Sequence, residues 1–310
     1  MSVRSALKDN VAIRADKEQK NRPAVCAVIV TYHPSHSMVQ HFQEVSAQVD
    51  KLVIVDNASN ADELQLLRGT SERQHCRLLE NTENLGIAEA LNQGIRIARE
   101  YGFQWVLLLD QDSHLTERFV DGMFETWAAH PQRDGLAAIH PRYVDPKTGS
   151  QSPVRRAGDG GPVSSMTSGA LMPTWIFDEI GWFASDYFID CVDTEYSFRI
   201  RAAGYAIADS TRAELSHATG DAQICKILGF SFRPTHHSLA RRYYMSRNRV
   251  VLFRQYLSIF PGWTLASMYD GMRDTLKCLI GEPNRATKLR YILLGTWDGL
   301  TGRLGRRENF

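Results

Sequence analysis

With 310 residues, of which 43% are hydrophobic and 23% charged, the chain is long enough for one large domain and has the composition of a globular protein. Its net charge is +1, and no window reaches the roughly 18–20 continuous apolar residues of a membrane span. Five scattered cysteines without a C-x-x-C pair argue against a disulfide framework and favour reduced thiols in the cytoplasm.

The first half of the chain alternates between strand and helix patterns. Residues 1–22 have neither an apolar run nor a cleavage site, so we expect a frayed arm rather than a signal peptide. Short apolar runs, typical of strands buried on both faces, occupy 25–30, 52–55, 77–80 and 105–109. Helical spacing separates them over 36–49, 61–67 and 87–98. This alternation predicts an α/β fold with one mostly parallel sheet that has helices on both faces.

The second half is less regular. We expect a helix over 116–130, a strand over 136–140 and a helix over 192–203. Short strand candidates follow at 205–208 and 213–216, and the chain is helical from 239 onward, with apolar faces over 263–280 and 288–300. Residues 145–162, rich in glycine, proline and charge, are either a flap over a site or a plain surface loop.

Polar residues gather at the carboxyl ends of the predicted strands, where parallel sheets bind their ligands. Those ends carry Thr31 and Tyr32, Asp56 and Asn57, Asn84, and Asp110 to Asp112. Asp56 could accept hydrogen bonds from a base or a ribose, or the residues from Asp56 onward could form a simple turn. We therefore expect a nucleotide-binding edge.

Asp110, Gln111 and Asp112 follow the most apolar of these strands. Two carboxylates at this position suit a hard divalent cation such as Mg²⁺ or Mn²⁺, which also binds phosphate. The alternative is a turn in which Asp112 or Ser113 caps the next helix.

Asn84 and Gly86 open a predicted helix, where glycine permits close approach and the helix N-terminus attracts negative charge. Neither a G-x-G-x-x-G pattern nor a P-loop lysine motif is present in the sequence, which argues against dehydrogenases and P-loop enzymes.

A second acidic segment contains Asp190, Asp193 and Glu195. A carboxylate at a helix start suits a general base that deprotonates a hydroxyl. The alternative for Asp193 is an N-cap with an ion pair to Arg199. His217, after a short strand, is either a neutral imidazole ligand beside a metal site or an ordinary polar residue.

The C-terminal part is basic. From Arg233 onward there are 14 Lys and Arg against five Asp and Glu, while the remainder carries 22 against 30. This block suits a diphosphate, a membrane surface or a nucleic acid, or it is a solvated helix surface. Arg241, Arg242 and Arg247 alternate with tyrosines, and arginine forks suit phosphate oxygens or anionic lipid.

Taken in order, these motifs resemble the inverting family-two glycosyltransferases with the GT-A fold, and most closely the bacterial rhamnosyltransferases. The similarity covers about residues 24–255. It is carried by Val30-Thr31-Tyr32, Asp56, Asn84 to Gly86, Leu109-Asp110-Gln111-Asp112-Ser113, Ser168-Gly169, Ile180 to Phe183, Asp193 with Arg199, His217 and Tyr243 to Asn248. Val192 stands where the family has glutamate before the base, which leaves open a shared role for Asp190.

The resemblance implies a GT-A core over 23–232 and a basic, amphipathic helical region over 233–310. It also implies that Asp193 is the general base and that Asp110, Asp112 and His217 bind Mg²⁺ or Mn²⁺. Arg247 would meet the diphosphate, and the other donor contacts would be Thr31, Tyr32, Asp56, Asn57, Asn84, Gly86, Asp110 and Gln111.

The donor implied by the resemblance is dTDP-L-rhamnose. The acceptor would be a saccharide of lipopolysaccharide, of another surface glycan or of a glycolipid, reached by an enzyme that rests on the cytoplasmic membrane face. One alternative is a nucleotidyltransferase, but the sequence has no glycine-rich loop with a basic residue near the first strand, as such enzymes need. A second alternative is a non-catalytic sugar-nucleotide scaffold, but binding alone would not require Asp193. We expect no nucleic-acid binding, because the sequence contains no recognition motif for it.

Overall fold

The computed structural model describes residues 22–145, 154–216, 225–227, 230–232 and 236–308. The predicted N-terminal arm, apart from Arg22, lies outside the described residues, and so do residues 146–153 of the predicted 145–162 loop. His217 also lies outside them.

One eight-stranded sheet, in the order β3-β2-β1-β4-β7-β6-β8-β5, organises the chain. The strands are β1 (Val25–Thr31), β2 (Lys51–Asp56), β3 (Arg77–Glu80), β4 (Trp105–Asp110), β5 (His114–Leu115), β6 (Leu136–Val144), β7 (Ala170–Pro173) and β8 (Ala206–Ser216). Strands β3, β2, β1 and β4 are parallel, whereas β7 runs antiparallel to both of its neighbours. β8 is parallel to β6 and antiparallel to β5. The two short strands predicted at 205–208 and 213–216 are thus one strand, β8.

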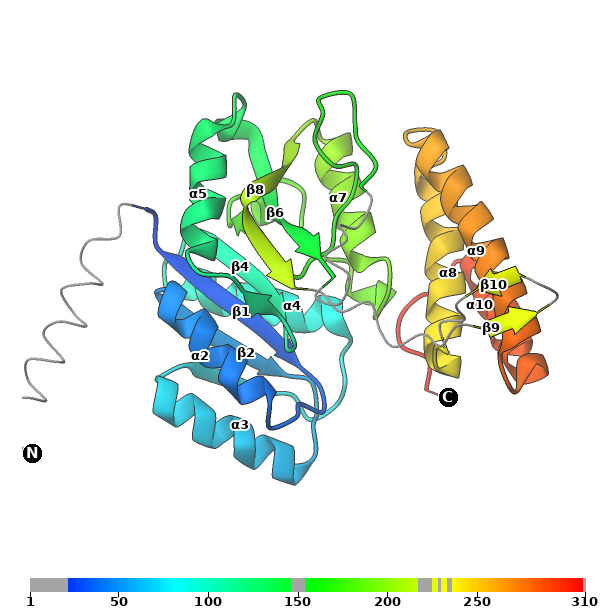
Figure 1. Cartoon of the computed structure of the whole chain (residues 1–310), viewed down its shortest axis with the longest axis horizontal. Helices are drawn as coiled ribbons and strands as arrows, with labels where there is room; N and C mark the ends of the chain where they lie inside the picture. The colour runs from blue at the N-terminus through cyan, green and yellow to red at the C-terminus, as the bar shows by residue number, and fades with distance from the viewer. Residues whose placement is uncertain (1–21, 146–153, 217–224, 228–229, 233–235, 309–310) are drawn as a thin grey trace, which may run out of the picture.

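Helices cover both faces of the sheet (Figure 1). The described α-helices of the chain are α2 (Met38–Gln48), α3 (Ala61–Gln74), α4 (Ile87–Glu100), α5 (Phe119–Ala129), α6 (Ile176–Glu179), α7 (Val192–Ala202), α8 (Leu239–Tyr256), α9 (Pro261–Gly281) and α10 (Arg285–Thr301). Short 3-10 helices η1 (Arg133–Gly135) and η2 (Ser185–Tyr187) and a hairpin of β9 (Cys225–Ile227) and β10 (Phe230–Phe232) complete the described elements.

Strand β1 shows why the predicted strands form. All seven of its residues are buried, and most are β-branched, which suits a pleated strand covered on both faces. Alternate residues face opposite sides: Val28 packs in the cluster under α4 and α7, and Ile29 in the cluster under α2 and α5. The continuous apolar run therefore reflects two cores rather than one.

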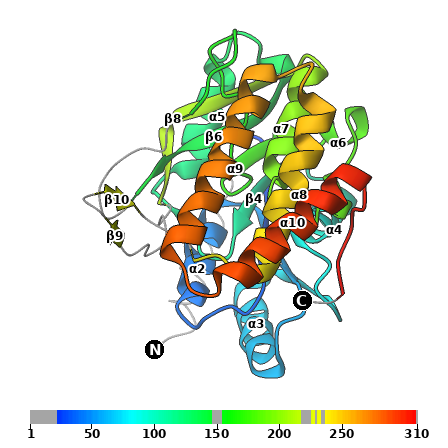
Figure 2. The ribbon, with the colours of Figure 1, turned by 90° about the vertical axis from the view of Figure 1, so that its right-hand side faces the viewer.

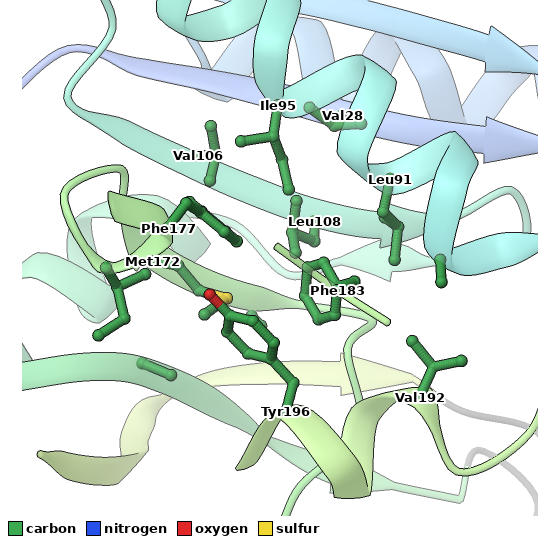
Figure 3. Close-up of a cluster of buried hydrophobic side chains, with 14 of the residues drawn as sticks. Val28, Leu91, Ile95, Val106, Leu108, Met172, Phe177, Phe183, Val192 and Tyr196 are labelled. Carbon is green, nitrogen blue, oxygen red and sulfur yellow. The ribbon is translucent and has the colours of Figure 1, made fainter. Parts of the chain in front are cut away.

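The first of these cores positions the second acidic segment. Val28 and Leu108 of the sheet, Leu91 of α4 and Phe183 meet Tyr196 of α7 in one buried cluster (Figure 3). Because α7 is fixed to the sheet by this cluster, the acids at its start are held near the carboxyl end of β4.

The C-terminal helices α8, α9 and α10 lie on the same side of the molecule as α7 (Figure 1). Val251, Leu252 and Tyr256 of α8 belong to the core around Tyr196, whereas α9 and α10 lie outside α8 (Figure 2). Among the helices within the described ranges, none combines the length and the apolar character needed to cross a membrane.

Candidate active site

The carboxyl ends of β1 and β2 are joined by the carboxylate of Asp56. Its Oδ1 accepts hydrogen bonds from the hydroxyls of Thr31, at 2.9 Å, and Ser59, at 2.5 Å, and its Oδ2 accepts from the Ser59 amide at 2.8 Å. Thr31 and Asp56 are fully buried. In this arrangement Asp56 holds the loop after β2, and its expected contact with a base stays a prediction.

Asn57 and Asn84 connect that loop to the start of α4. The Asn57 side chain donates to Asn84 Oδ1 at 3.0 Å and accepts from the Leu85 amide at 2.9 Å. Gly86, at the N-cap of α4, has φ +84°, and a Cβ there would overlap the carbonyl and side chain of Phe188. The close approach that this glycine permits is therefore made by the chain itself, because the Ile87 amide donates to the Phe188 carbonyl.

Gln111 fastens the end of β1 to the loop after β4. Its Oε1 accepts from the Tyr32 amide at 2.9 Å, and its Nε2 donates to the Tyr32 carbonyl at 3.2 Å. The Tyr32 ring is 46% exposed beside this clamp. Gln111 thus aligns two strand ends, and the Tyr32 ring is available to a ligand.

Asp110 and Asp112 lie next to each other on the open side of this edge. Both residues are exposed, and the Asp110 backbone amide donates to the hydroxyl oxygen of Ser168 at 3.3 Å. Although Asp110 is open to solvent, dense protein surroundings limit its hydration, and together with the carboxylates of Asp112 and Asp193 they raise its pKa to about 6. Arg241 acts in the opposite direction.

Such a pair suits a divalent cation. Carboxylate oxygens are the ligands that Mg²⁺ and Mn²⁺ prefer, and a cation would relieve the repulsion between the acids. Within the described ranges, however, no group of three or more His, Cys, Asp or Glu side chains is arranged to hold an ion. The third expected ligand, His217, is not among the described residues, so its role stays a prediction.

The second acidic segment forms a tight turn before α7. Phe188, Asp190 and Cys191 all have positive φ, between 63° and 64°. Such backbone costs free energy for residues other than glycine and persists only where the surroundings fix it. Here the side-chain amide of Asn248, on α8, donates to the carbonyls of Tyr187, Ile189 and Asp190 at 2.8–3.0 Å.

Asp193 has neither of the two structural roles that its sequence position allows. Cys191 occupies the N-cap of α7 without a capping side chain, and Arg199 pairs with Glu195 at 2.7 Å. The Asp193 Oδ1 accepts hydrogen bonds from the Thr194 amide and hydroxyl at 2.7 and 3.3 Å. Burial raises the pKa of Asp193, and the charge of Asp190 adds to this.

A cavity of about 300 Å³ opens beside Asp193. Its walls combine an aromatic ring, a guanidinium and hydroxyl groups, from Trp263, Arg155, Tyr143 and Ser165. Arg155 is tied to the start of α9 through the carbonyl of Gly262 at 3.3 Å. A cavity with this mixture of ring and polar groups has the chemistry to hold a saccharide against the Asp193 carboxylate.

The expected contact between Arg247 and a diphosphate is wrong for this geometry. Arg247 is fully buried, and its guanidinium donates to the carbonyls of Asp186, Tyr187 and Gly305 and to Asn248 Oδ1. With every arm of the guanidinium already bound, Arg247 fixes the turn before the base instead of meeting a ligand.

Arg241, on the same helix, is instead the arginine that lies beside the second acidic segment. Its side chain is 50% exposed, and it donates to Asp190 Oδ1 at 3.2 Å. The sequence placed it in the arginine cluster but gave no reason to prefer it. The missing signal was Ser238, which caps α8 by accepting from the Arg241 amide and so sets which face each arginine takes. Arg155 and Trp263 were also missed, since nothing local marks them.

Comparison with known proteins shows that this chain is similar to glycosyltransferases. Residues 26–174 match the profile of the family described as Glycosyl transferase family 2. Along most of its length the chain is similar to a dTDP-rhamnosyl transferase, RfbF, of Shigella flexneri. The two are 26% identical over 301 residues, which are 91% of this chain and 97% of that relative.

Solved structures share the fold. A mannosyltransferase from Pyrobaculum calidifontis, in complex with GDP-Man and Mn²⁺, superposes with a TM-score of 0.59 at 17% identity, over 92% of this chain and 89% of that one. GalNAc-T7 with UDP, GalNAc and Mn²⁺ gives 0.59 at 13% identity over 92% of this chain. The chain spans 58% of the GalNAc-T7 chain. These likenesses confirm the predicted GT-A fold with its C-terminal helical extension.

Proposed function

We propose that this protein, whose residues 26–174 match the family described as Glycosyl transferase family 2, moves L-rhamnose from dTDP-L-rhamnose to a hydroxyl of a surface saccharide or glycolipid, with inversion. The observation that carries the proposal is the convergence of Asp110, Asp112 and Asp193. The carboxylates of Asp112 and Asp193 both act on the pKa of Asp110, although they come from separate elements.

The donor assignment rests on two kinds of support. The relative from Shigella flexneri is named for dTDP-rhamnosyl transfer and matches this chain nearly end to end. The edge formed by Thr31, Asp56, Asn57 and Asn84 is a preorganised set of amide and carboxylate groups beside the exposed Tyr32 ring. Tyr32 would contact the base or ribose, and the asparagine network would position the loop that holds them.

Asp193 acts as the general base in this proposal. It takes the proton of the acceptor hydroxyl while the oxygen of that hydroxyl attacks the anomeric carbon, and the bond to the nucleoside diphosphate breaks on the opposite face. Its raised pKa makes the carboxylate a stronger proton acceptor than an exposed aspartate. The Thr194 amide and hydroxyl donate to Oδ1, and Oδ2 would accept the proton.

A divalent cation, Mg²⁺ or Mn²⁺, fits the carboxylates of Asp110 and Asp112, with His217 as a third proposed ligand. When bound, such an ion neutralises negative charge on the leaving diphosphate. Arg241 supplies a second positive charge from the protein, since it lies close enough to lower the pKa of Asp110.

The acceptor saccharide would occupy the cavity between Asp193 and Trp263. The indole of Trp263 would pack against the apolar face of a sugar ring, while Arg155 and the serines would bind its hydroxyl groups. The basic C-terminal helices would rest on the cytoplasmic membrane face when the acceptor is attached to a lipid.

The test is donor binding by Asp112→Ala, measured by calorimetry with dTDP-L-rhamnose in the presence and absence of Mn²⁺. We expect the wild type to bind the donor at least tenfold more tightly with Mn²⁺, and the variant to lose that difference. Asp134→Ala, which removes an exposed carboxylate far from the site, is the matched control and keeps it. Equal Mn²⁺ dependence in Asp112→Ala and the wild type would refute the metal role.

A further inference from the structure

A groove of about 390 Å³ runs between α8, α9 and α10, away from the cavity at Asp193. Its walls are largely apolar and come mainly from α9, through Met268, Met272, Leu276 and Leu279, with Ile292 of α10 opposite. The volume is in the range of sites that bind small organic ligands.

One cation, Arg249 of α8, lies in the wall of this groove. Its guanidinium packs against the backbone of α9 at Gly271, where a Cβ would overlap Nη1. Within the described part of the chain, Arg249 has no ion pair, and its buried Nε has no hydrogen-bond partner. Arg249 is partly buried, so a negatively charged group placed beside its guanidinium would be stabilised and could accept from the unpartnered Nε.

The groove is continuous with an apolar surface. Leu265, Tyr269, Met272, Leu276 and Ile280 follow one another at intervals of three and four residues along α9, so they share one face. All are exposed, and Met272 and Leu276 are 63% and 59% exposed. Leu293, Trp297 and Leu300 form a similar exposed stripe on α10. Both helices lie on the outer side of α8 (Figure 2).

Arg249 also lies near the turn that carries the base. Burial raises the pKa of Asp190 and of Cys191, three and two residues before Asp193, and the charge of Arg249 opposes that rise in both groups. A phosphate bound by Arg249 would thus sit between the apolar groove and the proposed catalytic centre.

We propose that this groove binds a lipid phosphate, with its phosphate on Arg249 and its hydrocarbon chain along Met268, Met272 and Leu276. The guanidinium fork matches phosphate oxygens, and the apolar wall matches the chain. This assignment extends the proposed transferase function and rests on it. The lipid would be the carrier of the acceptor saccharide, and Arg249 would hold its phosphate so that the saccharide lies within reach of Asp193.

The experiment is calorimetric titration of the full chain with farnesyl phosphate, alongside farnesol and inorganic phosphate. We expect farnesyl phosphate to bind at least tenfold more tightly than either part alone. Arg249→Gln and Leu276→Glu should each weaken that binding at least tenfold. Arg273→Gln is the matched control, because Arg273 is an exposed arginine of α9 that pairs with Asp270 outside the groove, and it should bind as the wild type does.

Several outcomes would overturn the proposal. Arg249→Gln with wild-type affinity would remove the phosphate site, and equal losses in Arg249→Gln and Arg273→Gln would indicate only general attraction to anions. Self-association that Leu276→Glu abolishes, without farnesyl phosphate binding, would assign the face to a second copy of the chain. If Arg249→Gln does not fold, Leu276→Glu decides, because its side chain is exposed and retained affinity contradicts the groove.

The titration contains no nucleotide sugar. Its failure therefore leaves the proposed transfer reaction standing, and a failure of donor binding leaves the lipid site standing.

Discussion

At the scale of single residues, two arginines of α8 differ completely in their surroundings. Arg241 is half exposed and pairs with Asp190, whereas Arg247 is fully buried among carbonyl groups. Six residues correspond to about 600° of helical rotation, so the two side chains leave the helix on different faces. Only one of them can reach a ligand at the sheet edge.

Their substitution should therefore have opposite consequences. Arg247→Gln removes bonds to three carbonyls, and we expect its thermal midpoint to fall by roughly 10 °C. Arg241→Gln should keep its thermal midpoint within about 2 °C of the wild type and lower donor affinity about tenfold. Differential scanning fluorimetry and donor titration measure both. A stable Arg247→Gln protein with weak donor binding would restore the contact with diphosphate that we reject.

The sequence and the structure agree best on residues at strand ends. Asp110 and Asp112 could be predicted because a buried strand fixes where its carboxyl end lies. The role of Gly86 could not, since its neighbour Phe188 is about a hundred residues away in the chain. The same limit explains Arg247: its hydrogen-bond partners lie near residues 186 and 305, and no local pattern identifies them.

At the scale of elements, a buried charge network joins the three C-terminal helices. Glu282, at the end of α9, accepts from Arg242 of α8 and from Lys288 of α10, each at 2.6 Å. Burial alone would raise the pKa of Glu282, but the bond from Lys288 and the charge of Arg242 outweigh it and lower the pKa to about 2.

Glu282→Gln should weaken the packing between the three C-terminal helices. Because it takes from Lys288 its buried carboxylate partner and removes one of the two acids that bind Arg242, we expect a loss of about 3–5 kcal/mol in unfolding free energy at pH 7. A carboxyl with a depressed pKa stabilises the fold above its unfolded value, near 4.5, and that contribution is lost as the pH falls toward 2. The difference between the variant and the wild type should accordingly shrink below pH 4.5.

Denaturation at pH 7 and at pH 3 measures this difference. Asp270→Asn, which removes an exposed partner of Arg273, is the control and should cost less than about 1 kcal/mol. If Glu282→Gln lowers the unfolding free energy by the same amount at both pH values, the carboxylate charge contributes nothing to the packing of the three helices.

Most helices and strands could be predicted from periodicity, but the pairing of the later strands could not. The parallel set β3-β2-β1-β4 follows from alternating strand and helix patterns. Strand β7 lies between β4 and β6 and runs antiparallel to both, although β6 precedes it in the chain. Such pairing is decided by long-range packing, which a local apolar pattern does not encode.

At the scale of the whole molecule, fewer arginines of the basic C-terminal block are available to a ligand than its charge count indicates. Arg242, Arg254 and Arg307 are bound by acids or carbonyls of the same helices, and Arg306 pairs with Glu83. We propose a division between a core of residues 23–232 and a helical region from 233, with α8 as the connection. Tyr256 of α8 donates to the buried Glu195, so the region supports the turn of the base directly.

Catalysis and membrane contact would thereby be linked through one helix. Asn248 of α8 fixes the turn before Asp193, and Arg249, the next residue, faces the groove of α9 and α10. A lipid phosphate bound in the groove would contact the same helix that holds the base turn. The basic charge that remains exposed, including Arg285, Arg290 and Arg303, lies beside the apolar stripe of α10, as expected of a face that meets anionic lipid.

The release of dTDP from dTDP-L-rhamnose, with Mn²⁺, by the wild type and by Asp193→Asn tests the account most directly. Asparagine keeps the shape of the side chain and cannot accept the proton, so we expect turnover to fall by at least about a hundredfold while donor binding stays within twofold. Turnover by Asp193→Asn close to that of the wild type, or a wild type that leaves this donor intact, would contradict the assignment of Asp193 and of the reaction.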